Sequence, residues 1–235
     1  SAVAETLTCA DTLAQITTTT NANPATFAWS GPGGFSSTVQ NPNVDTVGVY
    51  NVIITNGGNG CTNTASVTVT QNTTPPVADI ATPGNLNCLV TVLQLNGTPS
   101  SQGPNFDYQW TTADGNIVSG DTTLTPTVDA AGTYTLLVTN TATGCTSTDN
   151  ATVVQSPPVT ASIPSVSNVS CNGSQDGSAT AAGSGGSGSF TYEWSNGDTT
   201  ATTGNLAAGT YFVTLTDSEN CTATASVTIT QPALL

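Results

Sequence analysis

The sequence predicts an all-β protein built from three tandem β-sandwich domains. Three observations lead to this prediction: one pattern recurs three times, the strand-like runs alternate apolar residues with threonine, and turn-forming residues separate these runs. β-branched residues suit a half-buried pleated surface, and alternation with a period of two is typical of strands with one face in a core. No stretch shows a sustained period of 3.6, so no long helix is expected.

The repeated pattern ends each time in a cysteine. It reads VGVYNVIITNGGNGC at 47–61, AGTYTLLVTNTATGC at 131–145 and AGTYFVTLTDSENC at 208–221. Each copy then closes with a strand-like run, a glutamine and one or more prolines, and Pro-Pro pairs make stiff, extended spacers. We therefore expect boundaries near 75 and 157, with one domain each at 1–75, 76–157 and 158–235.

The order of aromatic residues favours the immunoglobulin-like form of the sandwich. A tryptophan lies in an early strand of each copy, and a later strand begins with the tyrosine expected of a tyrosine corner. In antibody domains the core cysteine stands two residues after that tyrosine, but here the position is aliphatic, so the tryptophans should pack on aliphatic side chains. The tryptophans are Trp29, Trp110 and Trp194, the tyrosines Tyr50, Tyr134 and Tyr211, and the aliphatic residues Val52, Leu136 and Val213.

The six cysteines allow two disulfide schemes. Pairing within each repeat gives Cys9–Cys61, Cys88–Cys145 and Cys171–Cys221, but these positions lie at opposite poles of an immunoglobulin-like domain. A staggered scheme joins neighbouring domains through Cys9–Cys145 and Cys88–Cys221, and leaves Cys61 and Cys171 at the two ends of the rod to pair between subunits. Both schemes remain open at this point.

The composition excludes several classes of function. The chain has 235 residues with no lysine, arginine or histidine, and its 14 acidic residues give a net charge of -14. Binding to nucleic acid or to anionic membrane surfaces needs basic residues, so neither partner is expected. No apolar run is long enough to insert into a membrane, and six cysteines near turns fit an oxidising, extracellular compartment.

The third copy resembles the SprB-type repeat of large surface adhesins of gliding Bacteroidota. The similarity covers about 171–232 and rests on the motifs CNGSQDGS, WSNG, LAAGTY and CTATASVTITQP. The first two copies resemble the related PKD-like and immunoglobulin-like domains of the same secreted proteins. The resemblance implies export through the type IX pathway and display outside the cell, and identifies no ligand.

Catalysis has little support in the sequence, and we expect no enzyme and no cofactor. Histidine and lysine bases are absent, and Glu193 beside Trp194 is more simply a solvent-facing strand residue. Calcium is the one metal that the acidic turns suggest, because it prefers hard oxygen ligands. Asp176, Asp217 and Glu219 are its candidate ligands, although ordinary polar turns explain these residues better.

Glycosylation is the other candidate modification. Six asparagines open an N-x-S/T sequon, and four threonines follow an aspartate as in the O-glycosylation pattern of Bacteroidota, which this sequence resembles. The sequon asparagines are Asn72, Asn96, Asn150, Asn168, Asn172 and Asn220, and the threonines are Thr12, Thr46, Thr122 and Thr199.

We therefore expect an extracellular structural or adhesive protein, a tandem sandwich segment of a cell-surface fibre, stalk or filament. Its expected partners are copies of itself in a filament or a longer array. The alternative is an adhesin module that recognises glycans or another surface, for which Phe35 and Phe190 near glycine-rich stretches are the candidate contacts.

Overall fold

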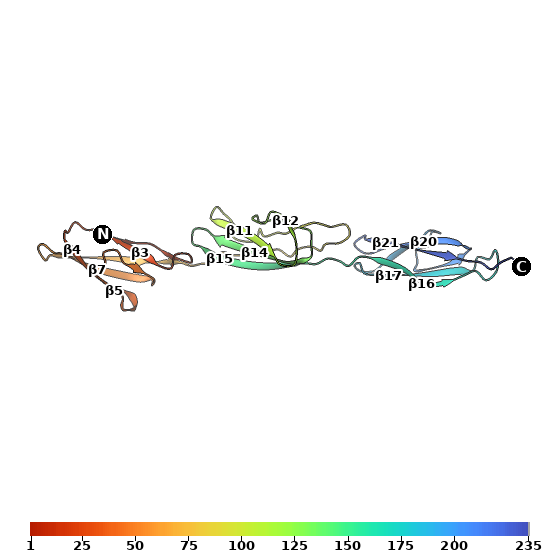
Figure 1. Cartoon of the computed structure of the whole chain (residues 1–235), viewed down its shortest axis with the longest axis horizontal. Helices are drawn as coiled ribbons and strands as arrows, with labels where there is room; N and C mark the ends of the chain where they lie inside the picture. The colour runs from red at the N-terminus through yellow and green to blue at the C-terminus, as the bar shows by residue number, and fades with distance from the viewer. Residues whose placement is uncertain (235) are drawn as a thin grey trace.

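The computed structural model describes residues 1–234 and shows a nearly all-β protein whose strands form three groups along one axis (Figure 1). We call these groups unit 1 (β1–β9), unit 2 (β10–β15) and unit 3 (β16–β21). Each unit has its own hydrophobic core. Within the described residues the one helical element is the 3-10 turn η1 at Pro32–Gly34. The predicted all-β class with tandem sandwiches is confirmed.

Each unit has two sheets that enclose its core, and unit 1 has in addition the two-stranded parallel pair β2–β9. The sheet orders are β1–β3–β6 and β5–β4–β7–β8 in unit 1, β10–β13–β12 and β11–β14–β15 in unit 2, and β16–β17–β19 and β18–β20–β21 in unit 3. Unit 1 has β1 (Ala2–Ala4), β2 (Leu7–Thr8), β3 (Ala14–Thr18), β4 (Ala25–Ser30), β5 (Ser36–Ser37), β6 (Asn43–Val44), β7 (Gly48–Asn56), β8 (Thr62–Val69) and β9 (Gln71–Asn72). Unit 2 has β10 (Leu93–Gln94), β11 (Phe106–Thr112), β12 (Ile117–Ser119), β13 (Thr127–Val128), β14 (Gly132–Asn140) and β15 (Cys145–Val153). Unit 3 has β16 (Thr160–Ser167), β17 (Gly177–Ser184), β18 (Thr191–Trp194), β19 (Thr202–Leu206), β20 (Gly209–Thr216) and β21 (Thr222–Ile229).

The three tryptophans lie in the cores, opposite the aliphatic residues that replace the antibody cysteine. In the antiparallel registers Trp29 pairs with Val52, Trp110 with Leu136 and Trp194 with Val213. All six side chains are buried. Directly opposite residues of a sheet point to the same face, so each indole contacts an aliphatic side chain where an antibody domain has its disulfide. This prediction is confirmed.

A tyrosine corner is present in all three units. Each tyrosine hydroxyl donates a hydrogen bond to the carbonyl oxygen four residues earlier: Tyr50 to Thr46 at 2.8 Å, Tyr134 to Ala130 at 2.7 Å and Tyr211 to Ala207 at 3.2 Å. The Tyr134 hydroxyl also accepts the backbone N–H of Asn116 at 3.0 Å. These bonds hold the backbone in the same conformation where β7, β14 and β20 begin, in all three units.

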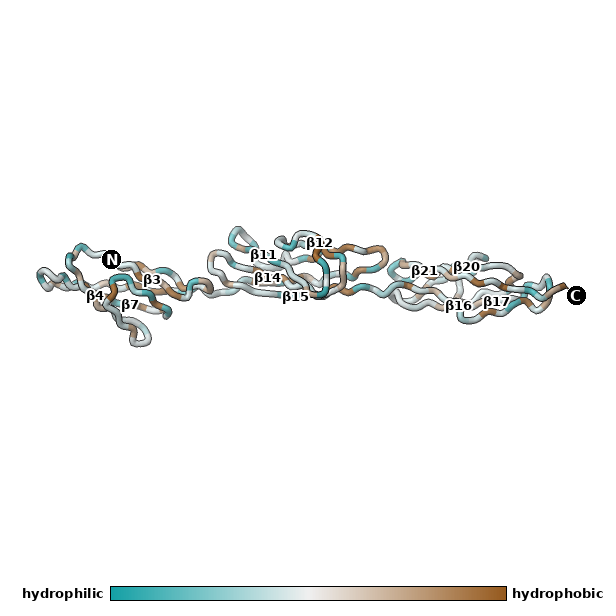
Figure 2. Tube along the Cα trace, in the orientation of Figure 1, coloured by the Kyte–Doolittle hydropathy of each residue, from teal (hydrophilic) through white to brown (hydrophobic). Residues whose placement is uncertain are grey.

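Hydrophobic and hydrophilic segments both occur in all three units (Figure 2). Burial alternates along strand β14, where Tyr134, Leu136 and Val138 are buried while the residues between them are more exposed. Among the residues described, no helix has the length and apolar character needed to span a bilayer.

Candidate functional site: the junctions between units

Disulfides join consecutive units. Cys9 of unit 1 bonds Cys145 of unit 2 with Cα atoms 4.9 Å apart, and Cys88 of unit 2 bonds Cys221 of unit 3 with Cα atoms 5.7 Å apart. Cys61 and Cys171 are free and exposed. The structure therefore has the staggered scheme within the chain.

Pairing within each repeat is wrong for this structure, and the reason is the length of the strands. Cys61 lies at the start of β8, whereas Cys9 lies near β9, which follows the other end of β8. A strand of eight residues spans about 26 Å, whereas the Cα atoms of a disulfide must approach within about 7 Å. The same separation of poles prevents Cys88–Cys145 and Cys171–Cys221.

The first cysteine of each unit lies on a segment that we call the base loop (residues 7–11, 86–90 and 169–173). Each base loop runs beside the last residues of its own unit. The backbone N–H of its first residue donates to a carbonyl oxygen there: Leu7 to Thr70 at 2.9 Å, Leu86 to Val154 at 2.9 Å and Val169 to Thr230 at 3.2 Å. These three apolar residues are buried, and the cysteine follows each of them by two residues. The three base loops thus present their cysteines in the same way.

The second cysteine of each unit ends a segment that we call the tip turn (residues 56–61, 140–145 and 217–221). The first side chain of each turn, Asn56, Asn140 or Asp217, accepts the backbone N–H two residues later at 2.8, 3.0 and 2.9 Å. The residue before each cysteine has a left-handed backbone, with φ of 76° at Gly60, 67° at Gly144 and 63° at Asn220. Glycine and asparagine adopt this conformation at the lowest cost, which explains why they precede the cysteines.

Junction 1, between units 1 and 2, contains a direct backbone contact beside its disulfide. The N–H of Ala10 donates to the carbonyl oxygen of Thr143 at 3.0 Å. Thr143 and Cys145 are both buried. On the side of unit 1, β2 and β9 form a two-stranded parallel pair that positions Cys9.

Junction 2, between units 2 and 3, has hydrogen bonds from its linker beside its disulfide. The N–H of Ser156 donates to the carbonyl oxygen of Leu86 in unit 2 at 2.9 Å, and its hydroxyl donates to Glu219 in unit 3 at 3.0 Å. Pro157 then accepts the N–H of Gly186 in unit 3 at 2.9 Å. The linker therefore contacts both units that it joins.

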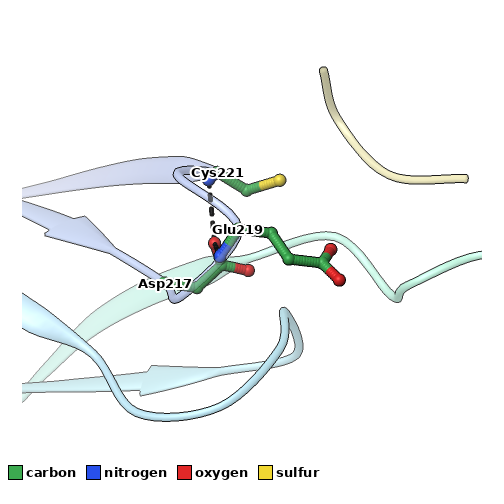
Figure 3. A group of neighbouring side chains, drawn as sticks. All are labelled: Asp217, Glu219 and Cys221. Atoms are coloured by element: carbon green, nitrogen blue, oxygen red, sulfur yellow. Dashed lines mark hydrogen bonds between the residues drawn. The ribbon is translucent and has the colours of Figure 1, made fainter. Parts of the chain in front are cut away.

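The acidic turn of unit 3 is organised by hydrogen bonds to its own backbone. Asp217 is buried and accepts the N–H groups of Ser187, Glu219 and Cys221 at 2.9, 2.9 and 2.8 Å; Figure 3 shows the last of these bonds. Burial raises the pKa of the Asp217 carboxyl, but these three donors together hold the pKa below its ordinary value.

Two carboxylates and one sulfur lie close together in this turn. Ligand atoms of Asp217, Glu219 and Cys221 all fall within 4.8 Å of one another. The Cys221 sulfur is bonded to Cys88, and a disulfide sulfur is not the thiolate that binds metals. Asp176 lies elsewhere and accepts the N–H of Ser170 at 3.0 Å, which lowers its pKa through side-chain and backbone hydrogen bonding to Ser170. A calcium site stays a prediction.

The other predicted residues lie on the surface or against a core. Glu193 is exposed on β18, as expected of a solvent-facing strand residue. Phe35 packs against the core of unit 1, 5.2 Å from the Tyr50 ring centroid in an edge-to-face arrangement, and Phe190 packs against the core of unit 3. All ten predicted glycosylation positions are exposed, and modification there stays a prediction: Asn72, Asn96, Asn150, Asn168, Asn172, Asn220, Thr12, Thr46, Thr122 and Thr199.

The residues that organise the base loops carry a signal in the sequence. An apolar residue stands two positions before each first cysteine, in the triplets LTC, LNC and VSC. Ala10, Ser156 and Glu219 carry no comparable signal, because their contacts depend on how the neighbouring unit is placed.

Fold and junctions together define a tandem array of immunoglobulin-like sandwiches whose consecutive members are covalently joined. Residues 163–199, in unit 3, match the family model of the SprB repeat. No curated protein matches the chain.

Among solved structures, the chain is similar to the I67–I69 fragment of the titin I-band, with 14% identity, a TM-score of 0.44 and coverage of 99% of this chain and 96% of that one. Three N-terminal domains of the bacteriophage RB49 outer capsid protein Hoc give 11% identity, a TM-score of 0.43 and coverage of 99% and 98%. A Dscam structure on isoform specificity gives 13% identity, a TM-score of 0.33 and coverage of 98% and 72%.

Proposed function

We propose that the chain is a non-enzymatic structural segment of an extracellular fibre, stalk or adhesin at a cell surface. The observation that carries this proposal is the covalent connection of consecutive units at both junctions. A flexible linker alone leaves neighbouring domains free to move, whereas a disulfide at the contact between them restricts that motion. The chain would then transmit load along its axis as a stiff rod.

The proposed location follows from the same cysteines. Disulfides persist in oxidising environments outside the cytosol, and the SprB match of residues 163–199 supports display on a cell surface. We include in the proposal a division of the chain near residues 75 and 157, supported by the prolines there and by the three separate cores. Phe35 and Phe190 contribute to those cores, so they offer little to a glycan, and the structural role is the one that we propose.

The load-bearing role can be tested by measuring how stiff the isolated chain is with and without its disulfides. The chain is produced with a secretion signal in an oxidising compartment, with Cys61→Ser and Cys171→Ser so that it stays monomeric. Small-angle scattering should show an extended rod, and a reductant that opens both disulfides should shorten the maximum dimension as the units begin to bend. Equal flexibility of the oxidised and reduced forms would rule out the load-bearing role.

A further inference from the structure

We propose that Cys171 of one copy and Cys61 of the next form the same inter-unit disulfide that joins units within the chain. Copies would then join end to end into a covalent filament. The inference rests on the proposed structural role and names the partner, which is a second copy of this chain. Both thiols are exposed and free.

The base loop holds Cys171 in the same way as the other two base loops hold Cys9 and Cys88. Two residues before it, Val169 is buried and donates its N–H to Thr230 at 3.2 Å, as Leu7 and Leu86 do in their units. The base loop also holds the segment that leaves unit 3: the N–H of Gly173 donates to the Gln231 side chain at 3.1 Å, and the Asn172 amide donates to the Pro232 carbonyl at 3.1 Å. The thiol is therefore held at the end of unit 3 that faces away from unit 2.

The tip turn holds Cys61 in the same way as the other two tip turns hold Cys145 and Cys221. Its tip turn has the same side-chain bond, from Gly58 N–H to Asn56 at 2.8 Å, and the same left-handed residue, Gly60, before the cysteine. In units 2 and 3 the equivalent cysteines bond the base loop of the preceding unit. Cys61 lies at the end of unit 1 that faces away from unit 2, where a base loop of another copy can reach it.

The surfaces beside the two thiols also correspond to a junction. Cys61 lines an open hollow of about 460 Å³ together with Ser1 and residues 19–22, the loop between β3 and β4. In unit 3 the equivalent loop, between β17 and β18, contains Gly186, which bonds the linker residue Pro157. Residues 232–234 follow Gln231 as residues 156–158 follow Gln155, and Leu234 is 81% exposed. We place residues 232–234 of one copy in this hollow of the next.

Charge explains why such a contact would need a covalent bond. The chain carries a net charge of -14 and no lysine, arginine or histidine side chain, so no side-chain ion pair can hold two copies together. The tip turn of unit 1 contains no carboxylate, whereas that of unit 3 contains Asp217 and Glu219. The end that would meet a second copy thus adds little repulsion, because charges farther away are screened over about 8 Å at physiological salt.

The bond requires a two-electron oxidant, and a protein disulfide of the thiol oxidoreductase class supplies it. The Cys171 thiolate attacks the donor disulfide, forms a mixed disulfide and releases one donor thiolate. The Cys61 thiolate of the next copy attacks the Cys171 sulfur and releases the second donor thiolate. The two cysteines lose two protons and two electrons in total, and the donor disulfide becomes a dithiol.

Electrophoresis without reductant tests the proposal. The oxidised wild-type chain, incubated with such a donor, should give a ladder with steps of one 23.4 kDa chain. A reductant should collapse the ladder to the monomer. Because the chain lacks trypsin sites, chymotryptic peptides should be used to find the Cys61–Cys171 linkage by mass spectrometry.

Single variants provide matched controls. Cys61→Ser and Cys171→Ser should each abolish every band above a dimer, and a mixture of the two should give one dimer and no ladder. A wild-type chain that stays monomeric would overturn the proposal, as would homodimers of either variant that form as readily as the mixed dimer. Rod-like scattering of the doubly substituted chain is independent of these outcomes, so failure of the filament can be distinguished from failure of the structural role.

Discussion

The two junctions of the chain share a disulfide between a base loop and a tip turn, but they differ in the hydrogen bonds around it. Junction 1 has one backbone bond between its units, from Ala10 to Thr143, and within residues 1–234 its linker residues 74–76 make no backbone hydrogen bond. Junction 2 has a linker that bonds both units through Ser156 and bonds unit 3 again through Pro157. The comparison indicates that the disulfide is common to both junctions, whereas the hydrogen bonds of the linker differ between them.

This comparison predicts that junction 1 depends more strongly on its disulfide. In the background without Cys61 and Cys171, we expect Cys9→Ser with Cys145→Ser to cause a large change in the shape of the chain. The joint keeps only the Ala10–Thr143 bond and an unbonded linker, so the maximum dimension in small-angle scattering should fall. Closing a loop of this length, with a sequence separation of 136, stabilises a chain by about 5 kcal/mol relative to its fully unfolded state, so the free energy of unfolding should also decrease.

The control is the pair Cys88→Ser and Cys221→Ser at junction 2, where the sequence separation is 133. Its effect on stability should be similar because the loops are of similar length. Its effect on shape should be smaller because Ser156 still bonds units 2 and 3. Equal bending at the two junctions would show that the linker bonds of Ser156 and Pro157 contribute nothing to stiffness.

A glycine-to-alanine substitution in the tip turn can separate two effects: the strain of the left-handed backbone and the clash with the neighbouring unit. A Cβ at Gly144 would lie 2.5 Å from the Cβ of Ala10, whereas nothing lies within 4 Å of one at Gly60. Both residues are left-handed, so alanine costs about 1–2 kcal/mol at either position. Gly144→Ala should in addition displace Ala10 and reduce the yield of the Cys9–Cys145 disulfide.

Thermal unfolding and quantification of free thiols measure these two effects. Gly60→Ala serves as the control, because it introduces the same backbone strain but has no neighbouring residue such as Ala10 to displace. An unchanged disulfide yield in Gly144→Ala would mean that the approach of Ala10 to the turn is easily adjusted.

Much of the fold could be predicted from local patterns, because those patterns are set by residues close in sequence. Trp110, Tyr134 and Leu136 occupy the positions expected from their spacing, since alternation along a strand decides which side chains enter the core. The strands β2 and β9 could not be predicted in this way, because two residues contain no period.

The disulfide pairing could not be predicted, because it depends on which poles of neighbouring units meet. The fold of unit 1 by itself separates Cys61 from Cys9, but only the placement of unit 2 against unit 1 brings Cys145 to Cys9. The acidic residues Asp217 and Glu219 also have a role that the sequence alone does not show: Asp217 organises the turn and Glu219 bonds the linker residue Ser156.

The smallest predicted effect is a sensitivity to acid at junction 2. The first residue of the tip turn is asparagine in units 1 and 2, at Asn56 and Asn140, and aspartate in unit 3, at Asp217. Backbone donors hold the pKa of Asp217 below its ordinary value despite its burial, so its ionised form is stabilised by folding. This contribution is complete above the unfolded pKa of about 3.9, and is lost as the pH falls through the lower pKa of the folded state.

Asp217→Asn should therefore lower stability at neutral pH and flatten the dependence on pH below about 4, the ordinary range of an aspartate pKa. The measurement is the melting temperature of the chain without Cys61 and Cys171 at a series of pH values, compared between the aspartate and asparagine forms. The other carboxylates titrate in both forms, so the difference between the two curves isolates Asp217. Asn140→Asp is the reciprocal variant, and should introduce a weaker acid sensitivity at junction 1, because the Asn140 side chain accepts one backbone N–H, from Ala142, where Asp217 accepts three. Parallel curves for Asp217→Asn and the parent chain would show that the charge of Asp217 contributes nothing to the turn beyond the shape of its side chain.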